Sequence, residues 1–172
     1  QLIEVHIEKL EREAMDLLQE HQVVVQRVAE VPGFGVDSVL QMIAEVGPTA
    51  AAFRSEKALS SWVGVCPGNE ESAGESHSTR SPKGNRQMRR LLNQAAHAAV
   101  KVKGSIFEVT FRRLLPRLGY KQAIWAIAHR LCRLLWLILH KGVRYRERGL
   151  EVGARSIRMR AARMIKELQK RG

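Results

Sequence analysis

The strongest constraint on the fold is a heptad repeat at the start of the chain. Apolar residues recur there at alternating intervals of four and three, with one histidine among them: Ile3, Ile7, Leu10, Ala14, Leu17, His21, Val24, Val28 and Val31. This spacing predicts one long helix over residues 1–31 and is typical of a coiled coil, so we expect a homo-oligomer formed through it. An amphipathic helix lying on its own domain remains the alternative.

The rest of the sequence also shows helical periods and no alternating strand pattern. Further helices are expected from about residues 36 to 46, 56 to 63, 85 to 99, 105 to 115 and 120 to 141, with breaks at Gly142, Gly149 and Gly153. Aromatic residues make up only 5% of the chain, which suits helices better than a β-sandwich. We therefore predict an all-α fold, with a connector helix over 1–31, a compact multi-helix domain over 32–150 and a basic helix or tail over 151–172.

The segment VPGFGVDSVLQMIAEVG resembles a helix-hairpin-helix element. Pro32 ends the first helix, and Gly33 and Gly35 permit a tight turn before the next helix. Glycines at such a turn let backbone amides approach a phosphate, so Gly33 and Gly35 are candidate phosphate-binding positions. A plain connection between two helices gives the same residues, and both interpretations stay open.

The charge of the chain points to a polyanionic partner. Its formal net charge is +12, with three basic and seven acidic side chains in residues 1–31 and a large basic excess after them. This distribution favours DNA or RNA over a membrane surface. The two cysteines and six histidines show no metal-ligand spacing, so neither a metal nor another cofactor is expected in this chain. A reduced, cytoplasmic setting is expected.

The segment from Glu71 to Arg90 combines four serines and a threonine with five cations. Arg80, Lys83, Arg86, Arg89 and Arg90 lie within 11 residues that contain no acid. Asn85 is expected to cap a helix whose first turns carry three of these arginines on one face. Guanidinium groups bind phosphate in a fork, so Arg80, Lys83, Asn85, Arg86, Arg89 and Arg90 are the candidate phosphate-binding residues. A solvated charged face is the alternative.

A serine in this segment is a candidate nucleophile. A serine hydroxyl needs a base, a metal or nearby cations to attack an ester, and the cations here could stabilise the developing charge. Small residues follow Ser72, which would let a bulky phosphodiester approach. Composition alone does not choose Ser72 over Ser76, Ser78 or Ser81.

Three further blocks make the sequence similar to a known family. LSSWVGVCPGNEESAG, KGNRQMRRLLNQAA and YKQAIWAIAHRLCRLLWLILHKG occur in the order and spacing that resemble the C-terminal transposase domain of the insertion sequence one-ten family. The resemblance covers about residues 28 to 148. It implies a site-specific recombinase that moves an insertion sequence, guided by a structured RNA.

The resemblance also implies roles for single residues. The family's serine motif matches Ser72-Ala73-Gly74, so Ser72 is expected to attack a DNA phosphodiester and form a covalent phosphoserine link. Lys83-Gly84-Asn85 and the pair Arg89-Arg90 match the basic block that follows. Magnesium is expected on a separate N-terminal DEDD carboxylate domain, so this chain is expected to be a fragment that is inactive alone.

Two other functions remain compatible with the residues. The helical domain could be a non-catalytic module that holds DNA or RNA, with Ser72 as an ordinary loop residue. It could also be an RNA-associated protein that binds through its basic tail. Substitution of Ser72 in a full-length protein separates these possibilities from a transposase.

Overall fold

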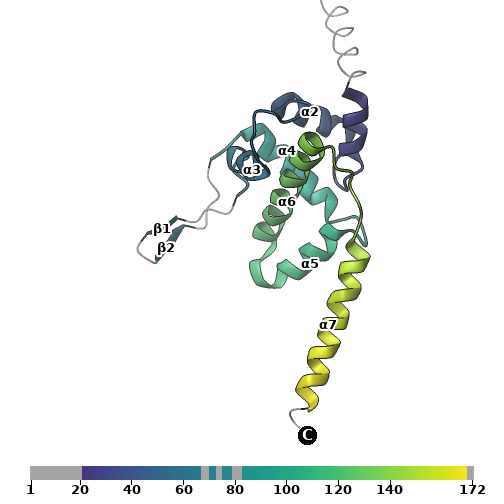
Figure 1. Ribbon diagram of the computed structural model, residues 1–172. Coiled ribbons are helices and arrows are strands. Elements are labelled where there is room, and N and C mark those ends of the chain that lie inside the picture. The colour runs from purple at the N-terminus through teal and green to yellow at the C-terminus, as the bar shows by residue number, and fades with distance from the viewer. Residues whose placement is uncertain (1–20, 67–69, 73–74, 79–82, 170–172) are drawn as a thin grey trace, which may run out of the picture.

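The computed structural model of the chain describes residues 21–66, 70–72, 75–78 and 83–169 (Figure 1). Residues 21–29 are helical and lead into α2 (Val36–Val46), α3 (Glu56–Val63), α4 (Arg86–Ala99), α5 (Ile106–Leu118), α6 (Tyr120–Lys141) and α7 (Gly149–Gln169). Two short antiparallel strands, β1 (Glu70–Ser72) and β2 (Glu75–Ser78), form a hairpin between α3 and α4. The body is built from helices alone, which confirms the predicted all-α class.

Helix α6 is the centre of the body. It packs against α3, α4 and α5 (Figure 1), and ten of its side chains are buried. Trp136 also donates a hydrogen bond from Nε1 to the backbone oxygen of Phe53 at 2.8 Å. Among the described helices, α6 alone is long and apolar enough to cross a membrane. Its burial inside the domain accounts for that composition, because a core helix needs the same residues.

Helix α4 has the cap and the inner face that its sequence predicts. The side chain of Asn85 accepts a hydrogen bond from the amide of Met88 at 2.8 Å, as an N-cap residue does. All six predicted core positions are buried: Met88, Leu91, Leu92, Ala95, Ala96 and Ala99. The opposite face of α4 is therefore left for polar side chains.

The end of the heptad repeat is used inside the domain. Val28 and Val31 are buried in the core, and Val24 packs partly against it. The predicted pairing of Val24 with a second helix stays a prediction, and the domain itself covers part of this side chain. The earlier seam positions, from Ile3 to Leu17, lie outside the described residues.

Three local predictions fail for physical reasons. Helix α5 was expected to end at about residue 115, but it continues through Pro116 to Leu118 and ends at Gly119. Pro116 is accommodated at the loss of one hydrogen bond, because it has no amide to donate to the carbonyl four residues earlier. Gly149 and Gly153 do not break the chain but lie in α7. No alternating strand pattern marks the segment after Cys66, yet it contains the β1–β2 hairpin. This hairpin stands off the core, so no buried face imposes an alternating apolar pattern on it.

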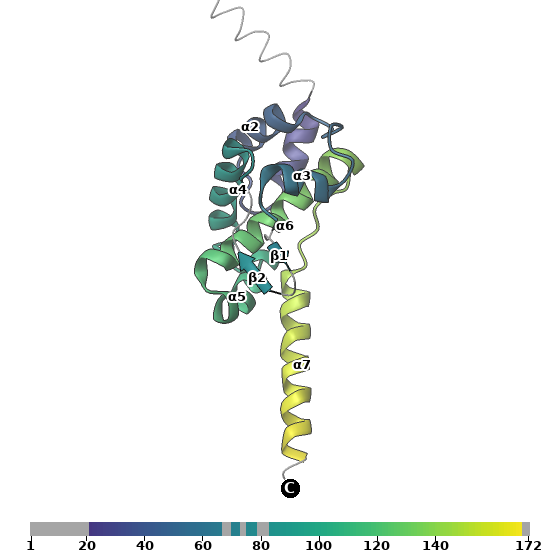
Figure 2. The same ribbon diagram turned by 90° about the vertical axis from the view of Figure 1, so that its left-hand side faces the viewer.

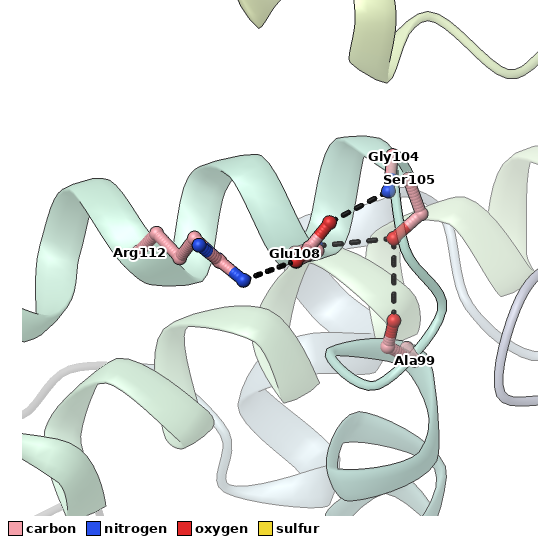
Figure 3. Close-up of polar contacts among 5 residues, drawn as sticks. All are labelled: Ala99, Gly104, Ser105, Glu108 and Arg112. Carbon is pink, nitrogen blue, oxygen red and sulfur yellow. Dashed lines mark hydrogen bonds and ion pairs between the residues drawn. The ribbon is translucent and has the colours of Figure 1, made fainter.

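The turn between α4 and α5 is fixed by a capping box (Figure 3). The hydroxyl of Ser105 accepts from the amide of Glu108 at 3.1 Å and donates to the oxygen of Ala99 at 3.2 Å. Glu108 in turn accepts from the amide of Gly104 at 2.6 Å and pairs with Arg112 at 2.8 Å. Glu108 thus bonds to the residue before the N-cap rather than to Ser105 itself, a variant of the capping box that satisfies one amide of the first turn of α5 and one of the preceding turn.

Glu147 ties the start of α7 to the start of α5. Its Oε1 accepts from the amides of Ile106 at 2.8 Å and Gly149 at 2.6 Å, and its Oε2 accepts from the hydroxyl of Tyr145 at 2.6 Å. Partial burial raises the pKa of Glu147, but these hydrogen bonds outweigh burial and leave that pKa below its ordinary value of 4.5.

The lowered pKa predicts a pH-dependent contribution to stability. Because the folded state holds Glu147 ionised, its contribution is complete above the ordinary carboxyl pKa of 4.5 and is lost as the pH falls through the lower folded-state pKa. The difference in free energy of unfolding between the wild type and Glu147→Gln should therefore shrink below pH 4.5. Urea titrations over a pH series measure it, and a difference that grows on acidification would contradict the assignment.

Candidate nucleic-acid interface

The β1–β2 hairpin stands on a tightly closed base. A Cβ added to Gly84 would lie 2.2 Å from the oxygen of Val63, so only glycine allows this approach to the end of α3. The amide of Asn85 donates to the oxygen of Trp62 at 3.2 Å, and Gly64 adopts the left-handed conformation that ends α3. The two ends of the segment from 66 to 83 are thereby held together.

Ser72 lies at the tip of this hairpin. It is the last residue of β1 and is paired with Glu75, the first residue of β2, whereas Ser76 and Ser78 lie further along β2 opposite Glu71 and Glu70. Figure 1 shows the hairpin projecting from the helical body. Arg80 and Ser81, which were also candidates, lie outside the described residues.

Two clefts lie on the outer face of α4, which we define as Arg86, Gln87, Arg90, Asn93 and Gln94. A cleft of about 550 Å³ is lined by Arg86, Gln87 and Arg90. Arg90 also lines a second cleft of about 260 Å³, together with Arg89, Asn93, Gln94 and Trp125. Arg86, Arg90 and Lys83 are exposed. The structure thus brings most of the predicted cations to one helix, directly after the hairpin.

Arg89 connects this face to the base of the hairpin. Its guanidinium stacks on the ring of Trp125 in α6, 4.6 Å from the ring centroid. It also donates a hydrogen bond to the oxygen of Gly64, at the end of α3. A planar guanidinium can stack and donate at once, which lysine cannot do. Arg89 therefore fixes α3, α4 and α6 relative to one another while still bordering the second cleft.

Asn85 is engaged in the structure of the domain. Besides capping α4, it donates from Nδ2 to Glu45 of α2 at 2.9 Å. The start of α4 thus has a carboxylate beside it, which disfavours an anion at that point. The charges favour a phosphate further along the helix, near Arg86 and Arg90.

Gly33 and Gly35 differ in their surroundings. A Cβ on Gly33, which has φ of +93°, would lie 2.3 Å from the oxygen of Ala95 and 2.8 Å from the amide nitrogen of Ala99. Gly33 is thus needed where the turn packs on α4. Gly35 caps α2, is exposed, and has no atom within 4 Å of an added Cβ. Gly35 is the more exposed of the two, and the binding of phosphate at either glycine stays a prediction.

A further row of side chains on α6 continues from Trp125. His129 and Arg133 follow it at intervals of four residues, which places the three on one side of the helix. Burial lowers the pKa of His129, and the charges of Arg133 and Arg130 lower it further, so this ring is neutral at pH 7. Arg133 is partly neutralised by Glu56 at 3.0 Å.

Neither cysteine is an activated nucleophile. Burial raises the pKa of the Cys66 thiol although Arg133 is near, and burial raises the pKa of Cys132 to about 12. The described part of the chain contains no group of three or more histidine, cysteine or acidic side chains that could hold a metal ion.

Comparison with known proteins places this architecture in a family. The model of the transposase IS116/IS110/IS902 family matches residues 25–110, half of the chain. The chain belongs to this transposase family. It is 28% identical over 153 residues to a probable family 20 transposase of Pseudomonas aeruginosa, covering 85% of the chain and 44% of that relative.

A second relative gives the same result. The chain is 31% identical over 126 residues to the transposase for insertion sequence element IS1111A of Coxiella burnetii, covering 70% of the chain and 34% of that relative. The chain therefore spans less than half the length of these two transposases. No solved structure matches it.

The family match contains both the hairpin and α4, but sequence reasoning missed part of the site. Asn93, Gln94 and Trp125 were not predicted. Asn93 and Gln94 could have been found, because they follow Arg86 and Arg90 at the spacing of one polar helix face. Trp125 could not, because its position depends on how α6 crosses α4.

The two glycines of the turn allow a direct test of whether close packing on α4 requires glycine at position 33. Gly33→Ala should lower the free energy of unfolding by about 2 kcal/mol or more, since it adds strain at positive φ and a clash with α4. Gly35→Ala is the matched control and should cost less than about 1 kcal/mol. Chemical denaturation measures both. Equal losses in the two variants would show that close packing at Gly33 is not the cause.

Proposed function

We propose that this chain is the part of a DNA transposase that supplies the serine nucleophile, with Ser72 attacking a DNA phosphodiester. The observation that carries the proposal is the placement of Ser72. It lies at the tip of a hairpin whose base is built onto the start of α4, and α4 carries the two clefts lined by Arg86 and Arg90. Family membership and the match to Ser72-Ala73-Gly74 support the same assignment.

The chemistry requires a short sequence of bond changes. The hydroxyl oxygen of Ser72 loses its proton and forms a bond to phosphorus, while the bond from phosphorus to one sugar oxygen breaks. That sugar oxygen takes up a proton and leaves as a free DNA end. The phosphoserine ester keeps the phosphoryl group available for attack by a second DNA end, so strands can be exchanged.

The residues of α4 would hold the DNA backbone during this step. Arg86 and Arg90 are exposed and present guanidinium groups on one face of the helix, which suits phosphate oxygens. Arg89, stacked on Trp125, would keep the hairpin base and this face in register. Lys83 adds a point charge at the foot of the hairpin. These contacts position the phosphodiester and stabilise its developing charge.

Magnesium and a guide RNA belong to this proposal through family resemblance. Among the described residues there is no carboxylate cluster to hold a metal. We therefore assign the metal-binding carboxylates to a part of the full transposase that the chain does not cover, consistent with the chain's 34% and 44% coverage of its relatives. That domain would supply charge neutralisation at the leaving oxygen.

The competing function is a non-catalytic nucleic-acid-binding module. The clefts of α4 alone would support it. Unlike the transposase proposal, it gives the hydroxyl of Ser72 no chemical role. Substitution of Ser72 therefore distinguishes the two functions.

A strand-exchange assay tests the nucleophile. In a full-length transposase containing this chain, with its guide RNA and DNA sites, Ser72→Ala should abolish recombination while DNA binding is retained. Ser76→Ala, in the middle of β2, is the matched control and should remain active. The 172-residue chain alone should form no covalent adduct with magnesium and DNA. Recombination that survives Ser72→Ala would refute the assignment.

The salt dependence of binding tests the α4 face. If about five cations contact phosphates, log K against log salt on duplex DNA should slope roughly −4 to −5. Arg86→Ala and Arg90→Ala should each flatten this slope by about one unit. Arg112→Ala is the control, because Arg112 is exposed on α5, pairs with Glu108 and lines neither cleft. Fluorescence anisotropy over a salt series measures the slopes, and a flat response would contradict phosphate binding here.

A further inference from the structure

Helix α7 carries an apolar stripe that nothing in the described part of the chain covers. Ile157, Ala161, Met164, Ile165 and Leu168 form this stripe and are all exposed, Ile157 and Leu168 at 70% each. Figures 1 and 2 both show α7 running away from the body. Exposed apolar surface of this extent on one side of a helix marks a binding surface.

The direction of α7 is built into the fold. Its first residue, Gly149, is buried against the start of α5, where an added Cβ would lie 2.0 Å from the oxygen of Gly104. Glu147 bonds to the first amide of α7 and to an amide of α5. The helix is thus anchored at one end and leaves its stripe available along the rest of its length.

The stripe has the spacing of a coiled-coil seam. Ile157, Ala161, Met164 and Leu168 follow one another at four, three and four residues, and Leu150 and Ala154 continue the same alternation toward the start of α7 in the sequence. The same alternation runs from Ile3 to Leu17 at the other end of the chain. Each segment therefore presents the pattern that another heptad helix fits.

The charges of the two segments are complementary. Residues 1–20 hold six acidic and two basic side chains, and Glu4, Glu11, Glu13 and Glu20 occupy positions that flank their seam. Residues 149–169 hold five basic and two acidic side chains; Arg158 and Arg160 flank the middle of the stripe, and Glu151 and Glu167 lie at flanking positions toward its two ends. Flanking charges of opposite sign select the partner in a coiled coil, so the glutamates of residues 1–20 favour the arginines of the middle of the stripe and oppose pairing of that segment with itself.

We propose that residues 1–20 of a second copy of this chain dock on the stripe of α7. The lengths are compatible, since 20 residues of helix span about 30 Å, more than the stretch of α7 from Ile157 to Leu168 needs. A second copy is the source because residues 21–29 meet the body at the end opposite to the free end of α7, as both views show.

The oligomeric state tests this pairing. The 172-residue chain should self-associate in sedimentation equilibrium. Ile157→Glu combined with Leu168→Glu should weaken association by roughly tenfold or more, because it places charges in an apolar seam. Both side chains are exposed in the single chain, so its folding should be unaffected. Met159→Glu is the matched control, since Met159 is 62% exposed on the opposite side of α7, and it should associate like the wild type.

A charge exchange identifies the occupant. Arg158→Glu with Arg160→Glu should weaken association, and adding Glu11→Arg with Glu13→Arg should restore it. Restoration would not follow if α7 bound DNA or a lipid surface.

Four outcomes would overturn the proposal. The first is a chain that stays monomeric, and the second is association that Leu10→Glu weakens but the stripe variants do not. The third is a charge exchange that fails to restore association. The fourth is stripe variants that lose binding to duplex DNA or anionic vesicles while their association is unchanged.

Discussion

The close approach of Gly84 to the end of α3 is the contact on which the candidate site depends. It brings the two ends of the segment from 66 to 83 together, so the β1–β2 hairpin leaves the body from one point. Arg89 reinforces that point by reaching Gly64 from α4 while stacking on Trp125 of α6. The position of Ser72 relative to the cations of α4 follows from this small set of backbone and guanidinium contacts.

The core and the charged surface are separated on single helices. Helix α4 turns six apolar side chains inward and presents arginines and amides outward, and α6 buries ten side chains while Trp125 borders the outer surface. Because apolar side chains fill the core, Arg86 and Arg90 are not needed there and remain available for a polyanion, whereas Arg89 joins helices of the body. This division explains how a small helical domain can carry a strongly basic surface.

Sequence alone predicted the features that follow from helical periodicity and missed those that depend on how distant helices pack against one another. The inner face of α4, the Asn85 cap and the ends of α3 and α6 follow from helical spacing and capping residues. The hairpin did not follow, because a pair of strands away from the core has no apolar alternation. The close packing of Gly33 on Ala95 did not follow either, because it arises from two segments that are distant in the sequence. The position of Trp125 beside α4 could not be predicted for the same reason.

The account depends most on the identity of the nucleophile, which peptide mapping of a trapped intermediate tests directly. A full-length transposase containing this chain would be incubated with a nicked DNA site that prevents religation, digested, and analysed by tandem mass spectrometry. We predict that the DNA-derived nucleotide is linked through its phosphate to Ser72, in the peptide that spans the tip of the hairpin. A nucleotide linked to Ser76, Ser78, Ser81 or a residue outside the hairpin would contradict the central claim.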